Sequence, residues 1–236
     1  MHVGVKSFPW RALGVVALLA AANPAFADYI YGSSNTSEAN KLIINGVTEL
    51  KSGKNQGWWS DIVPNGATNF NYFVGSLAGE SKVRNNFFVF DISDLSAPVT
   101  SAVLQLQVWD VFSSAGAATV LYSLFDVTTS AAILNNNEGT NEEIFNDLGS
   151  GKHYGSFAIP TGLATTDVVT MALNSAALAD LNAAILSNAE NFAIGGTLSF
   201  TPAPTQVSVP DHANTMLLLG LSIVYLWSLG RRKPAS

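Results

Sequence analysis

The feature that most limits how this chain can fold is an uncharged, largely apolar run near its C-terminus, residues 213–230. As a helix rising ~1.5 Å per residue, these 18 residues would extend ~27 Å, close to the ~30 Å hydrocarbon thickness of a bilayer. The basic tail 231–236 follows, and its Arg231, Arg232 and Lys233 favour the cytoplasmic side. We therefore expect a single-pass helix that holds the rest of the chain outside the inner membrane. A buried C-terminal core helix is the alternative.

A short motif stands before this helix, with Val209, Pro210 and Asp211 followed by His212 and Ala213. The motif (209–213), the helix and the basic tail together resemble the PEP-CTERM class of bacterial sorting signals. Val209-Pro210-Asp211 resembles its VPDSG-type variant, with His212-Ala213 where that variant has Ser-Gly. The resemblance implies that a membrane-embedded exosortase recognises residues 206–236, cleaves near the motif and transfers the protein to the cell surface or the exopolysaccharide matrix. Retention of the intact tail as a simple anchor is the alternative.

The N-terminal residues 1–27 predict a secretory signal peptide. A basic head is followed by an apolar run that is too short for a comfortable membrane span. The small residues Ala25 and Ala27 stand three and one positions before the bond to Asp28, as signal peptidase requires. We expect cleavage between Ala27 and Asp28. An uncleaved N-terminal anchor is the alternative.

One folded domain remains between these two segments, and we place it at residues 28–205. Its length can bury a substantial core. Residues 28–210 contain 6 basic and 16 acidic side chains, a net charge of −10, and such a surface repels phosphate backbones. We therefore expect no nucleic-acid partner. The chain has no cysteine, so burial and hydrogen bonding must stabilise the domain without disulfides.

Alternating and apolar runs predict β-strands throughout this domain. Residues 101–111 place Leu104, Leu106 and Val108 on one side, which is typical of a half-buried antiparallel strand. Residues 84–93 are apolar on both faces, which predicts a central strand covered on both sides. Weaker patterns predict strands over residues 41–50, 56–62, 69–74, 118–127, 154–159, 167–173 and 192–200.

One short α-helix is predicted over residues 176–187, where Leu178, Leu181 and Ile185 share a face. Asn174 or Ser175 is placed to cap its first turn, and a further helical turn is considered around residues 142–147. The fold class is therefore all-β, an antiparallel, jelly-roll-like β-sandwich with one short α-helix. The N-terminal signal helix and the C-terminal transmembrane helix would flank it.

Three stretches of the domain, residues 69–74, 84–93 and 168–196, resemble segments common in exported proteins that carry this C-terminal signal. The first of these stretches also resembles the Phe-Asp-Leu-Ser strands of jelly-roll surface domains. These resemblances imply a β-sandwich and imply no activity.

Catalytic side chains are scarce between the two terminal segments. His153 is the only histidine between residues 28 and 209, and the chain has neither a cysteine nor a Gly-x-Ser-x-Gly elbow. We expect His153 to be a solvated loop residue. Asp91, Asp110 and Asp126 are interpreted as strand-end residues rather than a glycosidase pair. The sequence names no catalytic residue, no metal ligand and no cofactor, and we do not expect an enzyme.

Two further stretches carry binding hypotheses. Residues 135–143 offer oxygen ligands of the kind calcium takes, although they lack EF-hand spacing. A calcium site is therefore one interpretation of this stretch, and a polar, mobile loop is the other. Trp58 and Trp59 lie in a predicted strand, where one indole would face the core and the other would face outward. An outward indole could stack on a sugar ring. Core packing of both rings is the alternative.

The sequence therefore predicts an exported protein of the cell surface or extracellular matrix, processed by signal peptidase and an exosortase, with a structural or adhesive role and no catalysis. The first alternative is a carbohydrate-binding module for exopolysaccharide. The second is a polysaccharide hydrolase or lyase that uses acidic residues the sequence does not single out.

Overall fold

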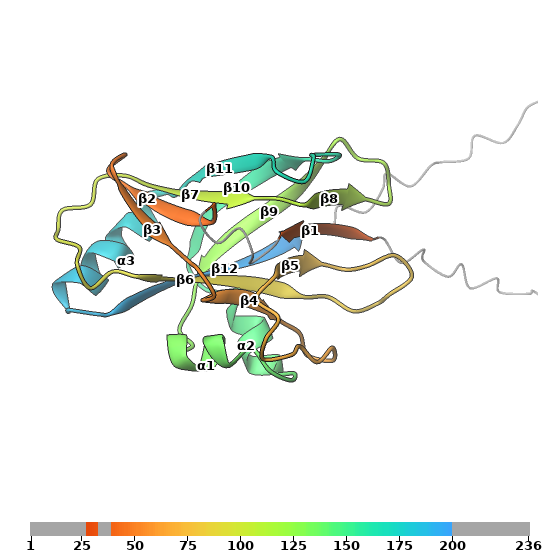
Figure 1. The fold of residues 1–236 in the computed structure, drawn as a ribbon, viewed down its shortest axis with the longest axis horizontal. Helices are drawn as coiled ribbons and strands as arrows, with labels where there is room; N and C mark the ends of the chain where they lie inside the picture. The colour runs from red at the N-terminus through yellow and green to blue at the C-terminus, as the bar shows by residue number, and fades with distance from the viewer. Residues whose placement is uncertain (1–26, 33–38, 200–236) are drawn as a thin grey trace, which may run out of the picture.

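The computed structural model describes residues 27–32 and 39–199. Most of the expected signal peptide, and all of the expected transmembrane helix 213–230 and basic tail 231–236, lie outside these residues. The described part is mostly β, with three antiparallel sheets and short helices (Figure 1). Within it, no helix has both the length and the apolar character needed to cross a bilayer.

The sheets contain five, four and three strands, and every neighbouring pair is antiparallel. The five-stranded sheet has the order β10 (His153–Pro160), β9 (Thr119–Asp126), β12 (Asn191–Ser199), β6 (Asn85–Asp91) and β4 (Gln56–Trp59). The four-stranded sheet has the order β11 (Val168–Ala172), β7 (Ala102–Gln107), β2 (Lys41–Ile44) and β3 (Thr48–Lys51). The three-stranded sheet has the order β5 (Tyr72–Gly75), β1 (Asp28–Gly32) and β8 (Asp110–Ser113).

One apolar core joins all three sheets to helix α3 (Ser175–Leu186). Ile30 comes from the three-stranded sheet, Leu104 from the four-stranded sheet, Phe88 from the five-stranded sheet and Leu181 from α3, and all four are buried. Burial of this continuous apolar surface is the main source of stability available to a chain without cysteine.

Strand β6 is buried on both faces, as its sequence predicts. Phe88 and Phe90 enter the shared core, whereas Phe87 and Val89 enter a second cluster on the opposite face. Helices α1 (Ala131–Asn136) and α2 (Glu142–Asp147) supply Leu134 and other apolar side chains to this second cluster. Figure 1 shows both helices beside β4 and β6, on the side away from the four-stranded sheet.

Two stretches predicted as single strands are divided in the structure. Residues 41–50 form the hairpin of β2 and β3, which turns at Asn45 and Gly46 with φ of 51° and 73°. An Asn-Gly pair is the preferred sequence for such a turn because both residues tolerate positive φ. Residues 101–111 are shared by β7 and β8. Val108 and Val111 are both buried, so the alternation changes phase where the chain passes between sheets.

The helix count also differs from the prediction, because the described residues contain three short helices rather than one. Helix α3 confirms the predicted helix, and the Asn174 side chain accepts hydrogen bonds from the Ala176 and Ala177 N–H groups. Helix α2 occupies the turn considered at residues 142–147. Helix α1 has six residues, too few to display a helical period, and was missed.

The other predicted strands are confirmed with shifted ends, and one strand was missed. The confirmed strands are β4, β5, β6, β9, β10, β11 and β12. The missed strand is β1, whose first residue follows the expected signal-peptide cleavage site.

Asn137, the residue after α1, is buried and fixes a stretch that was expected to be either a calcium site or a mobile loop. Its Oδ1 accepts from Asn65 Nδ2 at 2.8 Å, and its own Nδ2 donates to the Asn69 carbonyl. It adopts a left-handed conformation with φ of 50°. Gly57 leaves the necessary space, because a Cβ atom there would lie 2.4 Å from Asn137 Oδ1. Asn137 is therefore a buried, hydrogen-bonded part of the fold, which differs from the polar, mobile loop given as the alternative to a calcium site.

We predict that Asn137→Ala destabilises the protein by about 2–4 kcal/mol. The change leaves buried polar partners on Asn65 and Asn69 unsatisfied and places alanine at positive φ. Chemical denaturation monitored by tryptophan fluorescence measures the loss. Asn136→Ala, at the exposed neighbouring position, is the control and should change the free energy of unfolding by about 0.5 kcal/mol or less. Equal effects of the two changes would contradict the structural role of Asn137.

Candidate functional site

Most residues of the two predicted terminal signals lie outside the described residues. These are Val209, Pro210 and Asp211 of the motif, Arg231, Arg232 and Lys233 of the tail, and Ala25 of the signal peptide. Ala27 and Asp28 are described, and both are buried at the start of β1.

The two tryptophans of β4 do not form the expected platform. Trp58 is 8% exposed and Trp59 is 3% exposed, so the prediction that one indole faces outward is wrong. Trp59 packs in the cluster under α1 and α2. Trp58 lies against the guanidinium of Arg84, whose Cζ is 5.3 Å from the ring centroid. Both rings are thus used in packing, which was the stated alternative.

His153 is exposed, as expected, but it begins strand β10 instead of lying in a loop. Its Nε2 lies 2.8 Å from Ser156 Oγ, and Ser156 Oγ lies 2.7 Å from Ser123 Oγ. The imidazole also contacts the Phe125 ring edge to face. A nucleophile and base at this distance would satisfy one requirement of hydrolysis. No described carboxylate is recorded as a hydrogen-bond partner of the imidazole, so the arrangement lacks the third member of a triad.

Asp91, Asp110 and Asp126 lie at the ends of strands β6, β8 and β9, as interpreted. Asp91 Oδ1 accepts from the Ser93 backbone N–H, and Asp126 Oδ1 accepts from the Lys152 backbone N–H. Across the described residues, no group of three or more His, Cys, Asp or Glu side chains is arranged to hold a metal ion.

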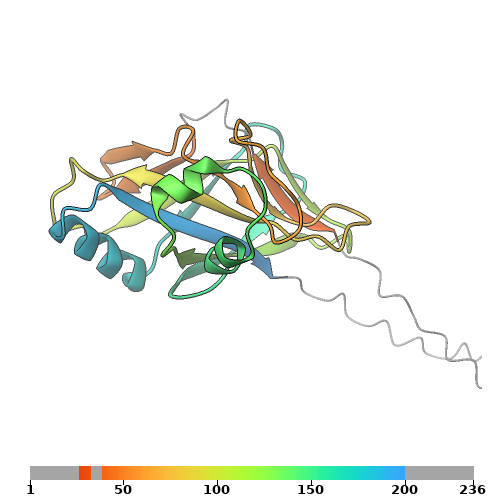
Figure 2. The same ribbon diagram turned by 90° about the horizontal axis from the view of Figure 1, so that it is seen from below.

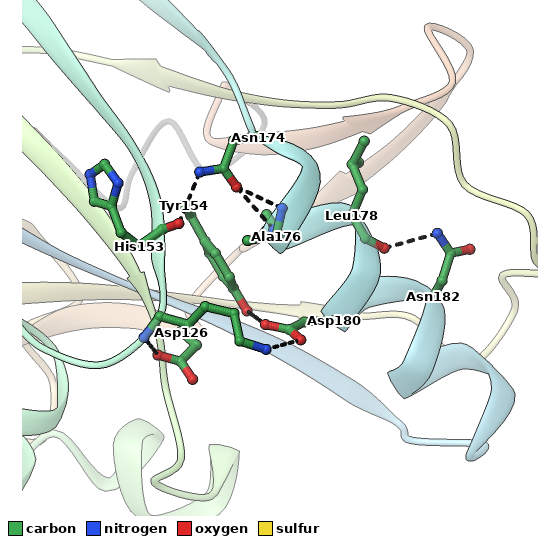
Figure 3. Close-up of polar contacts among 10 residues, drawn as sticks. Asp126, His153, Tyr154, Asn174, Ala176, Leu178, Asp180 and Asn182 are labelled. Atoms are coloured by element: carbon green, nitrogen blue, oxygen red, sulfur yellow. Dashed lines mark hydrogen bonds and ion pairs between the residues drawn. The ribbon is translucent and has the colours of Figure 1, made fainter.

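Asp180 joins helix α3 to strand β10. One carboxylate oxygen pairs with Lys152 Nζ, and the other accepts from the Tyr154 hydroxyl at 3.0 Å. Figure 3 shows the Tyr154 and Asp180 side chains pointing toward each other. Burial, followed by the hydrogen bond and charge of Asp180, raises the Tyr154 pKa well above its usual value. Tyr154 therefore keeps its proton and donates it in the hydrogen bond to Asp180. The contacts of Asp180 with Lys152 and Tyr154 fasten α3 to β10.

A hollow of about 700 Å³ lies between the start of α1 and helix α2. Asp147 lines it and accepts hydrogen bonds from four donors, the backbone N–H and hydroxyl groups of Thr128 and Thr129. Burial alone would raise the Asp147 pKa. The hydrogen bonds from Thr128 and Thr129 together lower it by more, so the pKa lies below its usual value. The carboxylate is saturated by the chain itself and ties the segment before α1 to the end of α2.

Aromatic side chains gather on the outer side of the three-stranded sheet, and this set is called the aromatic face. Its members are Tyr29, Tyr31, Phe73, Trp109 and Phe112. Tyr29 and Tyr31 alternate along β1 with the buried residues Asp28, Ile30 and Gly32. The period of two therefore turns both tyrosines away from the core.

The rings of the aromatic face form a column across three strands. Tyr29 stacks on Phe73 and on Phe112, with both centroid distances at 5.4 Å. Arg84 covers the Phe73 ring at 5.2 Å and continues the column to Trp58. The ring faces of Tyr29 and Phe73 are thus covered by their neighbours in the column. Phe112, at 38% exposed, ends the column and leaves ring surface open to solvent.

Polar groups flank the aromatic face. The Tyr29 hydroxyl donates to Asp110 Oδ2 at 2.7 Å, and Asn71 Nδ2 donates to the Tyr31 hydroxyl at 3.1 Å. Burial and the adjacent Asp110 raise the Tyr29 pKa to about 12, so the hydroxyl remains a donor at neutral pH. Trp109 is half-buried and meets Tyr31 edge to face at 5.5 Å. Open ring surface beside fixed carboxylate, amide and hydroxyl groups suits a ligand with both C–H and O–H groups.

Sequence reasoning missed this site, although its signal was present. Tyr29-Ile30-Tyr31 alternates in the manner of a strand. The meeting of β1, β5 and β8, which are far apart in the chain, could not be read from any local pattern.

Comparison with known proteins adds no assignment. No protein-family model matches the chain, and no curated protein matches it.

We predict that Asp147→Asn lowers the melting temperature at pH 7 by roughly 3 °C, because an amide replaces one of the two charged oxygens that accept from Thr128 and Thr129. The folded-state pKa is depressed, so the carboxylate stabilises the fold above the unfolded value of about 4. This contribution is lost as the pH falls through the folded-state pKa. Thermal melts from pH 7 down to pH 2.5 should therefore show the wild-type and variant curves converging. Asp94→Asn, at an exposed position, is the control, and a gap that stays constant with pH would contradict the assignment.

Proposed function

We propose that this protein is an exported, exosortase-processed β-domain that serves a structural or adhesive role at the cell surface or in the extracellular matrix. Signal peptidase and an exosortase would process it, and the helix 213–230 would hold it transiently in the inner membrane with the C-terminus cytoplasmic. The shared core between the two larger sheets supports a jelly-roll-like sandwich as its architecture. Absence of catalysis and of a cofactor stays a prediction.

The first and last strands of the described domain end close together, which supports a domain attached to the membrane at one end. A Cβ atom on Gly75 would lie 2.0 Å from the Asp28 carbonyl and 2.9 Å from Leu198 Cδ1, so the start of β1 and the end of β12 are neighbours. Figure 2 shows the two ends of the coloured ribbon together, with α3 at the opposite end of the molecule. A domain leaving its tether from one pole presents the remaining surface freely.

The aromatic face carries the adhesive part of the proposal, and exopolysaccharide is the partner it favours. Sugar rings present apolar C–H faces that stack on aromatic rings and hydroxyl groups that bond to polar side chains. Phe112 and Trp109 supply ring surface, while Asp110 and Asn71 supply polar contacts. The net charge of −10 over residues 28–210 favours neutral over anionic polymers. Among the described residues, no specific observation favours the hydrolase or lyase alternative.

We predict that Trp109→Ala and Phe112→Ala each weaken retention on the producing organism's neutral polysaccharide by about 1 kcal/mol, roughly fivefold. Affinity electrophoresis in gels that contain the polysaccharide measures the retention. Leu121→Ala is the matched control, because Leu121 is 40% exposed on β9 and outside the aromatic face. If both aromatic variants keep the wild-type retention and the wild-type melting temperature, the binding hypothesis is wrong.

We predict that a chain lacking residues 206–236 is secreted without surface attachment, because it has no membrane helix and no exosortase motif. Cell fractionation and intact-mass measurement compare it with the full chain in a host that has an exosortase. The full chain should reach the surface with its tail removed. A full chain that stays in the inner membrane with its tail intact would argue for a simple anchored protein.

A further inference from the structure

The bond between Ala27 and Asp28 is built into the three-stranded sheet. Ala27 is 0% exposed, its N–H donates to Ser114 Oγ at 2.8 Å, and its carbonyl accepts from the Ser114 N–H at 2.7 Å. The next carbonyl, that of Asp28, accepts from the Ser76 N–H at 3.0 Å. Strand β1 is also the middle strand, held by β5 and β8. A protease that needs an extended, accessible segment cannot reach this bond after the sheet has formed.

Two buried polar groups beside this bond have no hydrogen-bond partner. They are Asp28 Oδ1 and Ser113 Oγ, and each residue is 8% exposed. Asp28 and Ser113 are direct partners across β1 and β8, so both groups lie on the same buried side of the sheet. A buried carboxylate oxygen without a donor is costly, because it has lost its hydration and gained no replacement. The pair is therefore a small buried site in which the carboxylate oxygen lacks a hydrogen-bond donor.

We propose that the missing donor is the N-terminal ammonium of Asp28, created when signal peptidase cuts the chain. Hydrolysis adds water across the Ala27–Asp28 peptide bond, so Ala27 leaves as a carboxylate and the Asp28 nitrogen becomes an ammonium with three N–H donors. This group arises on the same residue as the unpartnered carboxylate oxygen, and Asp28 is the cross-strand partner of Ser113. The proposal rests on the proposed export for the position of the cut. Because the folded sheet buries the bond, the cut precedes the docking of β1.

Two opposing effects decide whether the cleaved chain is favoured. Removal of Ala27 takes away both hydrogen bonds to Ser114 and a buried methyl group. The new ammonium gains a charge-assisted bond to the carboxylate, which is stronger than a bond between neutral groups. It also places a cation in a domain whose net charge is −10. In the uncleaved chain the Asp28 carboxylate has no such partner.

Four chains that all span residues 28–236, purified in detergent, test the proposal. Two carry Asp28 with either a free or an acetylated N-terminus, and two carry Asp28→Asn with the same two termini. The acetyl group restores a carbonyl for the Ser114 N–H and removes the charge, so a role for hydrogen bonding alone predicts that acetylation stabilises. The proposal predicts that the free-amine chain melts about 3 °C or more above the acetylated chain. It further predicts that Asp28→Asn lowers the melting temperature of the free-amine chain and leaves that of the acetylated chain unchanged or raised.

An acetylated chain as stable as the free-amine chain, with equal effects of Asp28→Asn in both, would overturn the proposal. If Asp28→Asn prevents folding of both chains, Ser113→Ala replaces it, and the larger loss is again expected with the free amine. The predicted cleavage position fails separately, if the intact mass of the exported protein shows an N-terminal residue other than Asp28.

Discussion

The fold depends on one strand that is apolar on both faces. Strand β6 lies inside the five-stranded sheet and sends Phe88 and Phe90 to the core shared by all three sheets. Its alternate residues Phe87 and Val89 require a cover on the other face, and the short helices α1 and α2 provide it. Neither helix is long enough to be stable alone, so both exist because this face must be buried.

Buried amides, together with the Asp147 carboxylate, fix the loops around this cover. Asn137 bonds to Asn65 and Asn69, and Asn85 Nδ2 donates to the Phe145 carbonyl at the end of α2. An amide has both donors and an acceptor and satisfies buried backbone groups without the desolvation penalty of an ion. Asp91 and Asp147 lie at a strand end and a helix end, where they accept hydrogen bonds from backbone N–H groups.

The strands with a clear period and the one 12-residue helix could be predicted because their patterns are local. The double burial of β6 was likewise legible in Phe87 to Phe90. The division of residues 101–111 could not be predicted, because it depends on distant segments. The Val108 N–H bonds to the Asp167 carbonyl, whereas the next N–H, that of Trp109, bonds to the Tyr31 carbonyl. The Trp58 interpretation failed for the same reason, because Arg84 covers the ring that alternation alone would expose. The aromatic face is assembled from three distant strands, so its components were visible and their meeting was not.

The position of β12 determines how the domain would respond to tension. This strand runs between β9 and β6, and Ser199 at its end is the last described residue before the expected anchor. A pull applied there along the strand axis loads the hydrogen bonds on both sides of β12 in parallel. An edge strand pulled along its axis would load one ladder, whereas β12 must release the ladders to β9 and β6 together.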